Sequence, residues 1–207
     1  MDVNEYYNRL LAEKAIEEFK GRNIEGWYFE DRASALEKAL SLIPEGGTVS
    51  CGGSETFQEV GLRDALKEGR YEFYDPLDGK GGAAMDAIAR KALGADCYFT
   101  GANAISATGE IVNIDGYGNR TAAIIYGPKR VVVIAGMNKV SDSLESAIAR
   151  ARGIAAAKAV AIFKQDFKSY DELKAAAETA QSHIVITKRS ALPGRIFLLL
   201  VGETLGF

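Results

Sequence analysis

Polar residues that could bind an anion occupy the loop Gly52-Gly53-Ser54-Glu55-Thr56, which directly follows a short apolar segment. Glycines at 52 and 53 allow close approach to the backbone, and the hydroxyls of Ser54 and Thr56 can donate hydrogen bonds. The loop could therefore hold a phosphate or a carboxylate, although it matches neither the Walker nor the Rossmann pattern. A tight strand-to-helix turn capped by Ser54 is the alternative interpretation.

The densest group of polar residues runs from 108 to 120 and contains two carboxylates, two amides, a tyrosine, an arginine and three glycines. The planar guanidinium of Arg120 suits bidentate recognition of a carboxylate or phosphate, and the alternative is a structural ion pair with Asp115. Glu110 or Asp115 could act as nucleophile or general base. The whole segment could instead be a solvated hairpin with turns at Asp115-Gly116 and Gly118-Asn119.

A third loop, 100–104, places the amide of Asn103 where it could bind a ligand or satisfy the backbone of a turn. The predicted catalytic residues are Glu110 and Asp115. The predicted ligand-binding residues are Gly52, Gly53, Ser54, Thr56, Asn103, Gly116, Gly118, Asn119 and Arg120.

The sequence contains few cysteine and histidine residues that could bind a metal ion. Cys51 and Cys97 lie 46 positions apart, and His183, the one histidine, is remote from both. Such an inventory provides no C-x-x-C site and no disulfide framework, so we expect no metal. Cys51 precedes a glycine turn where a helix N-terminus could lower the thiol pKa, but a buried strand cysteine is the simpler interpretation. We expect His183 to be a surface or packed residue.

Alternating apolar segments and amphipathic helices must position these loops. Helical spacing of apolar residues predicts helices at 2–20, 33–43, 57–66, 81–93, 142–163 and 170–181. Apolar runs predict strands at 24–29, 48–51, 71–74, 96–100, 183–187 and 195–201, a hairpin at 104–114 around Thr108-Gly109, and two apolar segments, 122–126 and 130–135, that flank Gly127-Pro128. Asp2 and Glu5 form a candidate capping box for the first helix.

This order predicts an α/β fold: a mostly parallel open sheet with helices on both faces, mixed by the hairpin insertion and the C-terminal strands, and preceded by an N-terminal helix. We expect one domain over 1–207, with 1–21 as a helical arm. Ligands of open α/β sheets bind at the carboxyl ends of the strands, which is where the three polar loops fall.

Composition excludes several classes of protein. The chain has 207 residues, 47% of them hydrophobic, with 25 basic and 28 acidic side chains and a net charge of −3. We expect no broad nucleic-acid surface. The longest apolar runs, 131–135 and 196–201, are far shorter than the roughly 20 residues that span a bilayer, so we expect no membrane segment. The acidic N-terminal residues do not resemble a secretory signal, and a cytoplasmic location is the simplest expectation.

Taken together, the loops resemble the LUD, or lactate-utilisation, domain family. The matching blocks are GSxT at 53–56, DCYFTGANAI at 96–105, GEIVNIDGxGNR at 109–120, YGPK at 126–129, GRI at 194–196 and VGExLGF at 201–207. The resemblance implies a sheet like that of CoA transferases and ribose-5-phosphate isomerase (NagB/RpiA-like), whose relatives handle phosphorylated or CoA-linked molecules. Well-described members belong to bacterial operons that oxidise L-lactate to pyruvate beside iron–sulfur partner proteins.

The resemblance thus predicts a protein that binds a small anionic or phosphorylated metabolite and serves lactate or organic-acid utilisation. Many relatives carry a cysteine-rich segment before the last strand, whereas 165–195 here contains no cysteine. We therefore expect no cofactor in this chain and an accessory role beside iron–sulfur redox subunits. The alternatives are a stand-alone CoA-transferase-like or ligase-like enzyme using Glu110 or Asp115, and a regulatory or structural module. Exposed edge strands and the N-terminal helix make a homodimer plausible.

Overall fold

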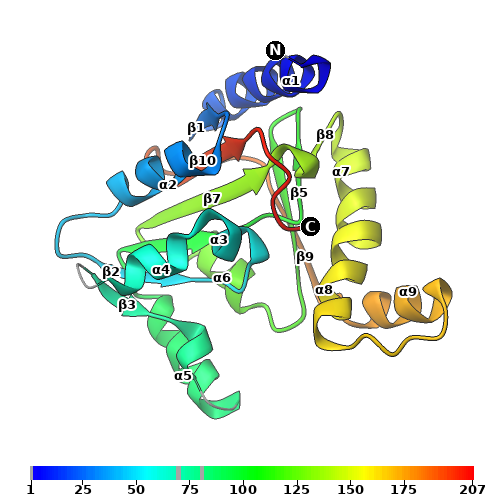
Figure 1. Cartoon of the computed structure of the whole chain (residues 1–207). Helices are drawn as coiled ribbons and strands as arrows, with labels where there is room; N and C mark the ends of the chain where they lie inside the picture. Colours follow the sequence, from blue (N-terminus) through cyan, green and yellow to red (C-terminus); the bar gives the residue numbers. More distant parts are fainter. Residues whose placement is uncertain (1, 69–70, 80–81) are drawn as a thin grey trace.

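The computed structural model describes residues 2–68, 71–79 and 82–207 (Figure 1). Its α-helices are α1 (Val3–Lys20), α2 (Arg32–Ser41), α3 (Glu55–Val60), α4 (Leu62–Lys67), α5 (Gly82–Ala92), α6 (Asn119–Ile125), α7 (Leu144–Arg150), α8 (Ala156–Phe163) and α9 (Tyr170–Thr179). Its strands are β1 (Ile24–Phe29), β2 (Thr48–Cys51), β3 (Glu72–Tyr74), β4 (Cys97–Thr100), β5 (Ala104–Ser106), β6 (Glu110–Asp115), β7 (Arg130–Gly136), β8 (Val140–Ser141), β9 (His183–Thr187) and β10 (Ile196–Val201).

Six of these strands form a parallel sheet in the order β1-β10-β7-β4-β2-β3, with helices on both faces. The predicted hairpin, β5 and β6, belongs to a second, smaller sheet in the order β8-β5-β6-β9, where β5 pairs parallel with β8 and β6 antiparallel with β9. The predicted α/β class with a parallel sheet, helices on both faces and an N-terminal helix is confirmed. The hairpin does not enter the main sheet, and β10 lies inside that sheet as a parallel strand.

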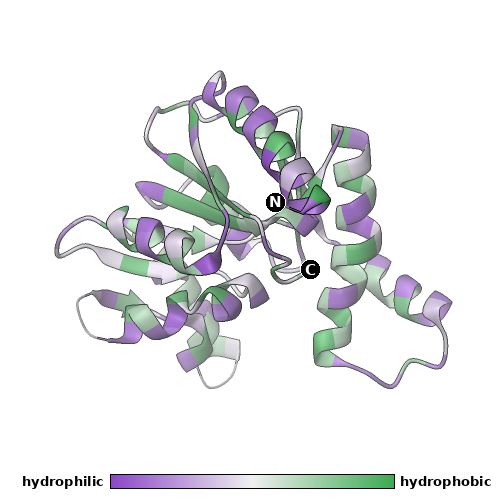
Figure 2. Ribbon diagram, turned by 45° about the horizontal axis from the view of Figure 1, so that its top comes forward, coloured by the Kyte–Doolittle hydropathy of each residue, from purple (hydrophilic) through white to green (hydrophobic). Residues whose placement is uncertain are grey.

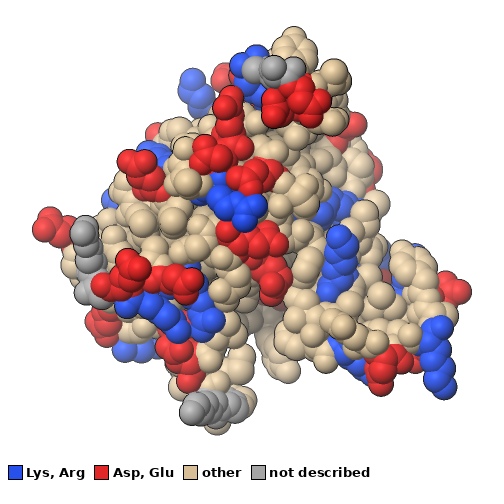
Figure 3. Space-filling model, in the orientation of Figure 1, with Lys and Arg blue, Asp and Glu red and all other residues tan. Residues whose placement is uncertain are grey.

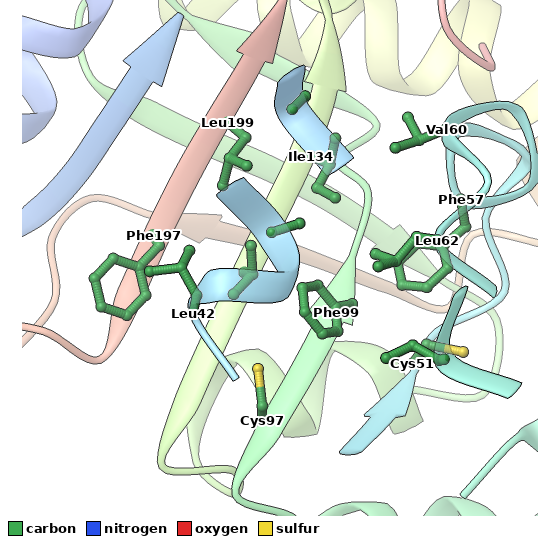
Figure 4. Packing of buried hydrophobic residues seen from close by; sticks show 14 of the residues in the cluster. Leu42, Cys51, Phe57, Val60, Leu62, Cys97, Phe99, Ile134, Phe197 and Leu199 are labelled. Carbon is green, nitrogen blue, oxygen red and sulfur yellow. The ribbon is translucent and has the colours of Figure 1, made fainter. Parts of the chain in front are cut away.

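Alternating side chains of the central strands build a core on each face of the parallel sheet. In β10, Phe197 and Leu199 face α2, α3 and α4 and belong to one cluster, whereas Ile196 and Leu198 face the other way. Figure 4 shows the first cluster, in which side chains of β4, β7 and β10 meet those of α3 and α4. Burial on both faces explains why these strands read as continuous apolar runs. Figure 2 shows hydrophobic residues along the strands and mixed hydropathy along the helices.

The second core cluster packs α1 and the hairpin against the sheet. Ala12, Ala15 and Phe19 of α1 are fully buried there, together with Ile105 and Ile111 of the hairpin. The predicted capping box is present: the Asp2 side chain accepts from the backbone of the first turn, and that of Glu5 accepts from the backbone of Asp2. The N-terminal helix therefore covers the sheet instead of standing apart from it.

Three predicted segments differ in detail. The helix expected at 57–66 is divided at Gly61, whose φ of 75° is left-handed, into α3 and α4. Residues 122–126, which the apolar pattern left unassigned, lie mostly within α6. The long helix expected at 142–163 is continuous but contains a π-helical turn, Ala151–Ala155, between α7 and α8. Gly81, the expected start of α5, lies outside the described residues. No helix in the described ranges is long and apolar enough to cross a bilayer.

Candidate functional site

Three neighbouring parallel strands, β7, β4 and β2, bring three loops to the same edge of the sheet. β2 ends at Cys51 and leads into 52–54, β4 ends at Thr100 and leads into 101–103, and β7 ends at Gly136 and leads into the 3₁₀ turn Met137–Lys139. Because parallel strands present their carboxyl ends together, the loops after β2 and β4, two of the three that the sequence placed at strand ends, lie side by side with Met137–Lys139. The third predicted loop, 108–120, does not follow a strand of this sheet, because it contains the hairpin turn, β6 of the smaller sheet and the start of α6. We call this region the carboxyl edge.

Two glycines let the loops of the carboxyl edge approach closely. A Cβ atom added at Gly101 would lie 2.8 Å from the hydroxyl oxygen of Ser54, closer than real contacts allow. A Cβ atom added at Gly52 would lie 3.3 Å from Cδ of Arg120. The first loop, the second loop and Arg120 are therefore in contact, as expected for residues that share a site.

Arg120 is held in place by Asp115 and Asn103. Its Nε donates to Oδ1 of Asp115 at 2.8 Å, and one terminal nitrogen donates to Oδ1 of Asn103 at 2.8 Å and to the Ile114 carbonyl at 2.6 Å. The other Asp115 oxygen accepts from the backbone N–H of Thr121 at 2.8 Å. The ion pair that the sequence offered as the alternative is thus present, and Asp115 neutralises Arg120.

Lys139 is the most unusual charged residue of the site. Its side chain is buried, with the residue 4% exposed, and Nζ donates to the hydroxyl oxygen of Thr56 at 2.9 Å. Among the described residues, no carboxylate forms an ion pair with this amine. Burial, followed by the positive charges of Arg150 and Arg120, lowers the pKa of Lys139 to about 8, with an opposing effect of Glu59.

Arg150 supplies a second cation without a carboxylate partner in the part of the chain that the structure describes. Its guanidinium donates to the backbone carbonyls of Asn138, at 2.9 Å, and Asn103. Burial lowers the pKa of Arg150. Since Asn103 accepts from Arg150 through its backbone and from Arg120 through its side chain, the two guanidinium groups converge on this one residue. We call Lys139, Arg150 and Arg120 the basic cluster.

The remaining predicted residues do not all reach the basic cluster. Glu110 begins β6, whereas Asp115 ends it, so a strand of six residues, roughly 17 Å at 3.3 Å per residue, separates them. Glu110 instead pairs with Arg22 at 3.3 Å and accepts from Thr108 at 2.7 Å. The structure therefore does not place the two predicted catalytic carboxylates in one site.

Gly116 and Gly118 lie in the connection between β6 and α6, and Asn119 is the first residue of α6. Gly118 has a left-handed φ of 80° and precedes the first residue of α6, and a Cβ there would lie 3.3 Å from the ring of His183. Gly116 and Asn119 are exposed. These residues position the chain between Asp115 and Arg120, and in the described structure no hydrogen bond joins the Asn119 side chain to the basic cluster.

Cys51 is not an activated nucleophile, because burial raises the pKa of its thiol to about 12.

Within the residues that the structure covers, no group of three or more His, Cys, Asp or Glu side chains could hold a metal ion. Acidic and basic side chains are interspersed on the face of the molecule shown in Figure 3.

Sequence reasoning missed Lys139 and Arg150. Lys139 follows an apolar strand just as the loops 52–56 and 100–104 do, and its place at a strand end was the available signal. Arg150 lies in α7 among alanines, with no local pattern that indicates a site. Its place in the basic cluster is seen only in the structure, where the Arg150 guanidinium of α7 donates to the Asn103 carbonyl in the loop after β4.

The fold and the basic cluster define an α/β protein with three cationic side chains at the carboxyl edge of a parallel sheet, of which Lys139 is buried and Arg120 and Arg150 are partly exposed. The sequence model of the LUD domain matches residues 12–201. The chain belongs to the LUD domain family. A comparison with curated protein sequences gives no significant match. The crystal structure of a DUF162 family protein from Deinococcus radiodurans, at 1.70 Å resolution, is similar in fold with a TM-score of 0.53 and 12% sequence identity, over 96% of this chain and 98% of that one.

Proposed function

We propose that this LUD-domain protein binds a small anionic metabolite at the carboxyl edge, where Lys139 and Arg150 attract the anion and Arg120 borders it. The observation that carries the proposal is Lys139, a buried ammonium with no carboxylate ion pair among the described residues. Burying a charge without a counter-charge is costly. A carboxylate or phosphate ligand would supply the missing negative charge.

The charge balance around Lys139 supports an anion over a cation or a neutral ligand. Asp115 neutralises Arg120, which leaves the charges of Lys139 and Arg150 without ion-pair partners in the described structure. Glu59 acts on Lys139 through space, but it is exposed and its carboxylate accepts from the backbone N–H of Gly206 at 2.6 Å. The basic cluster therefore holds an excess of positive charge in a setting of low dielectric, where its attraction for an anion is strong.

Family membership supports an organic acid as the anion and a role in lactate or organic-acid utilisation. Because 165–195 contains no cysteine, we propose an accessory role beside iron–sulfur redox subunits. The alternative, an enzyme that uses a carboxylate nucleophile, has weaker geometric support. Both oxygens of Asp115 are occupied by Arg120 and Thr121, and Glu110 lies at the far end of β6.

The test is a thermal-shift and calorimetry panel of L-lactate, pyruvate, inorganic phosphate, sugar phosphates and acyl-CoAs. A ligand at about 100 times its Kd adds roughly 2.7 kcal/mol, which raises the melting temperature of a chain of this size by about 5 to 10 °C. We expect at least one anion to stabilise the wild type and to lose at least tenfold in affinity in Lys139→Met.

Lys129→Met is the matched control, because the Lys129 side chain is 80% exposed and pairs with Asp96, which directly precedes β4 at the end of the sheet opposite the carboxyl edge. This variant should bind as the wild type does. Equal affinity in Lys139→Met and the wild type, or no stabilisation of the wild type by any anion of the panel, would overturn the proposal.

A further inference from the structure

The hydroxyl of Thr56 holds the amine of Lys139 through one hydrogen bond. The Thr56 hydroxyl donates its only proton to the backbone carbonyl of Leu205 at 3.3 Å, so toward Lys139 at 2.9 Å it can only accept. One N–H of the amine is therefore engaged by Thr56. The lone pair of the uncharged amine is not consumed by this contact, and it becomes accessible to an electrophile once the segment Leu205–Gly206, which covers the amine, is displaced.

The surroundings of Lys139 increase the fraction of its amine that is uncharged at neutral pH. Arg150 and Arg120 oppose its protonation, Glu59 is the facing carboxylate that favours it, and burial disfavours the charge. With a pKa of about 8, roughly one amine in ten is uncharged at pH 7, against about one in 3,000 for an ordinary lysine. Desolvation and neighbouring cations are the usual means by which a lysine becomes a nucleophile.

We propose that Lys139 is a catalytic amine that forms an imine with an anionic aldehyde or ketone whose carboxylate or phosphate is bound by Arg150 and Arg120. This inference rests on the proposed anion site and names the class of its substrate. A buried amine beside two guanidinium groups is complementary to a carbonyl carbon close to an anionic group. A non-carbonyl anion would use the guanidinium groups but leave the amine without a reaction partner.

The step balances without an oxidant or reductant. The lone pair of Nζ forms a bond to the carbonyl carbon, and the carbonyl π electrons move to oxygen, which gains a proton. Nitrogen then loses its protons as the C=N bond forms and the hydroxyl leaves as water. The net change is amine plus carbonyl to imine plus water, and the protonated imine can accept electrons from an adjacent C–H or C–C bond.

The segment Leu205–Gly206 covers the amine. Gly206 has a left-handed φ of 56°, and an added Cβ would lie 2.7 Å from the hydroxyl of Thr56 and 3.1 Å from Nζ of Lys139. The Asn138 side chain accepts from the N–H of Leu205 and donates to the carbonyl of Gly206. In Figure 1 this red segment runs beside α3. A substrate must displace the segment to reach Nζ, and its return would keep water from the imine.

The experiment is reductive trapping. The wild-type protein is incubated with pyruvate or with dihydroxyacetone phosphate, cyanoborohydride is added, and intact mass and peptide mapping locate the adduct. The two substrates distinguish a carboxylate from a phosphate. We expect one adduct per chain, on Lys139, formed more than tenfold faster than on any exposed lysine and suppressed by excess L-lactate or phosphate. Lys139→Arg, which lacks the primary amine, should give no adduct, and Lys129→Arg should react as the wild type does.

The outcomes separate this inference from the proposed function. If L-lactate or phosphate binds the wild type but no carbonyl compound labels Lys139 ahead of exposed lysines, the imine is refuted and the anion site stands. If no anion binds, both fail. Peptide mapping of the wild type decides the matter even if a Lys139 variant does not fold. Thr56→Val should lower the trapping rate, because it removes the oxygen that accepts from Nζ of Lys139.

Discussion

Lys139→Met should remove a pH dependence from the stability of the ligand-free protein. Below pH 8 the amine is charged in both the folded and the unfolded chain, and the folded state bears the cost of burying that charge. As the pH rises through about 8, the folded protein releases the proton while the unfolded chain, with its ordinary pKa of 10.5, retains it. The wild type should therefore gain stability with rising pH, and methionine cannot contribute this gain.

The size of the effect follows from the two pKa values. Linkage over pH 6 to 9, with a folded pKa of about 8 and an unfolded pKa of 10.5, gives a gain of about 1.4 kcal/mol for the wild type. At pH 6 the variant should be at least as stable as the wild type, because it replaces an uncompensated buried charge with an apolar chain of similar length. Such a stability cost at one residue is what a ligand-binding role would explain.

The assay is urea denaturation of both proteins at pH 6, 7, 8 and 9 in the absence of added anions. Cys51 and Cys97, whose pKa values burial raises to about 12, lower the stability at alkaline pH, but equally in both proteins. The difference in unfolding free energy, variant minus wild type, should fall by about 1.4 kcal/mol from pH 6 to pH 9. A difference that stays constant across this range would refute the account of Lys139, and Lys129→Met should show that constancy.

Three further substitutions test the site and the core. Asp115→Asn should destabilise the protein by about 3 kcal/mol in urea denaturation, since it leaves Arg120 without its partner; a loss below 1 kcal/mol would contradict the buried pair. Glu110→Gln should leave anion affinity unchanged within about twofold by calorimetry, because it lies at the far end of β6. Phe99→Ala should cost about 3 to 5 kcal/mol, because Phe99 is fully buried and packs edge-on against Phe57 (Figure 4).

Local patterns explain how much of the fold was predictable. Apolar runs such as 131–135 and 196–201 predicted buried parallel strands, and Asp2 with Glu5 predicted the start of α1. The place of β10 between β1 and β7 could not be predicted, because strand order depends on which faces pack together and not on any one segment. The hairpin β5–β6 forms a separate sheet because it pairs with β8 and β9, and no one of these segments alone indicates that pairing.

The site was predictable where neighbours in sequence are neighbours in space. Asp115 and Arg120 lie five positions apart, and their ion pair was one of two stated alternatives. Lys139 and Thr56 lie 83 positions apart, and Leu205, which helps to cover them, lies 149 positions from Thr56. Burial is what makes Lys139 unusual, and no feature of its own segment indicates that burial.

The charge of Lys139 in the presence and absence of an anion tests the central claim most directly. With ¹³C-labelled lysine, the Cε chemical shift of Lys139, assigned with Lys139→Arg, reports its protonation across a pH titration. The account predicts a midpoint near 8 in the free protein and an increase of at least one pH unit when saturating L-lactate or phosphate binds beside it. A midpoint near 10.5 in the free protein, or one that no anion of the panel moves, would contradict the account.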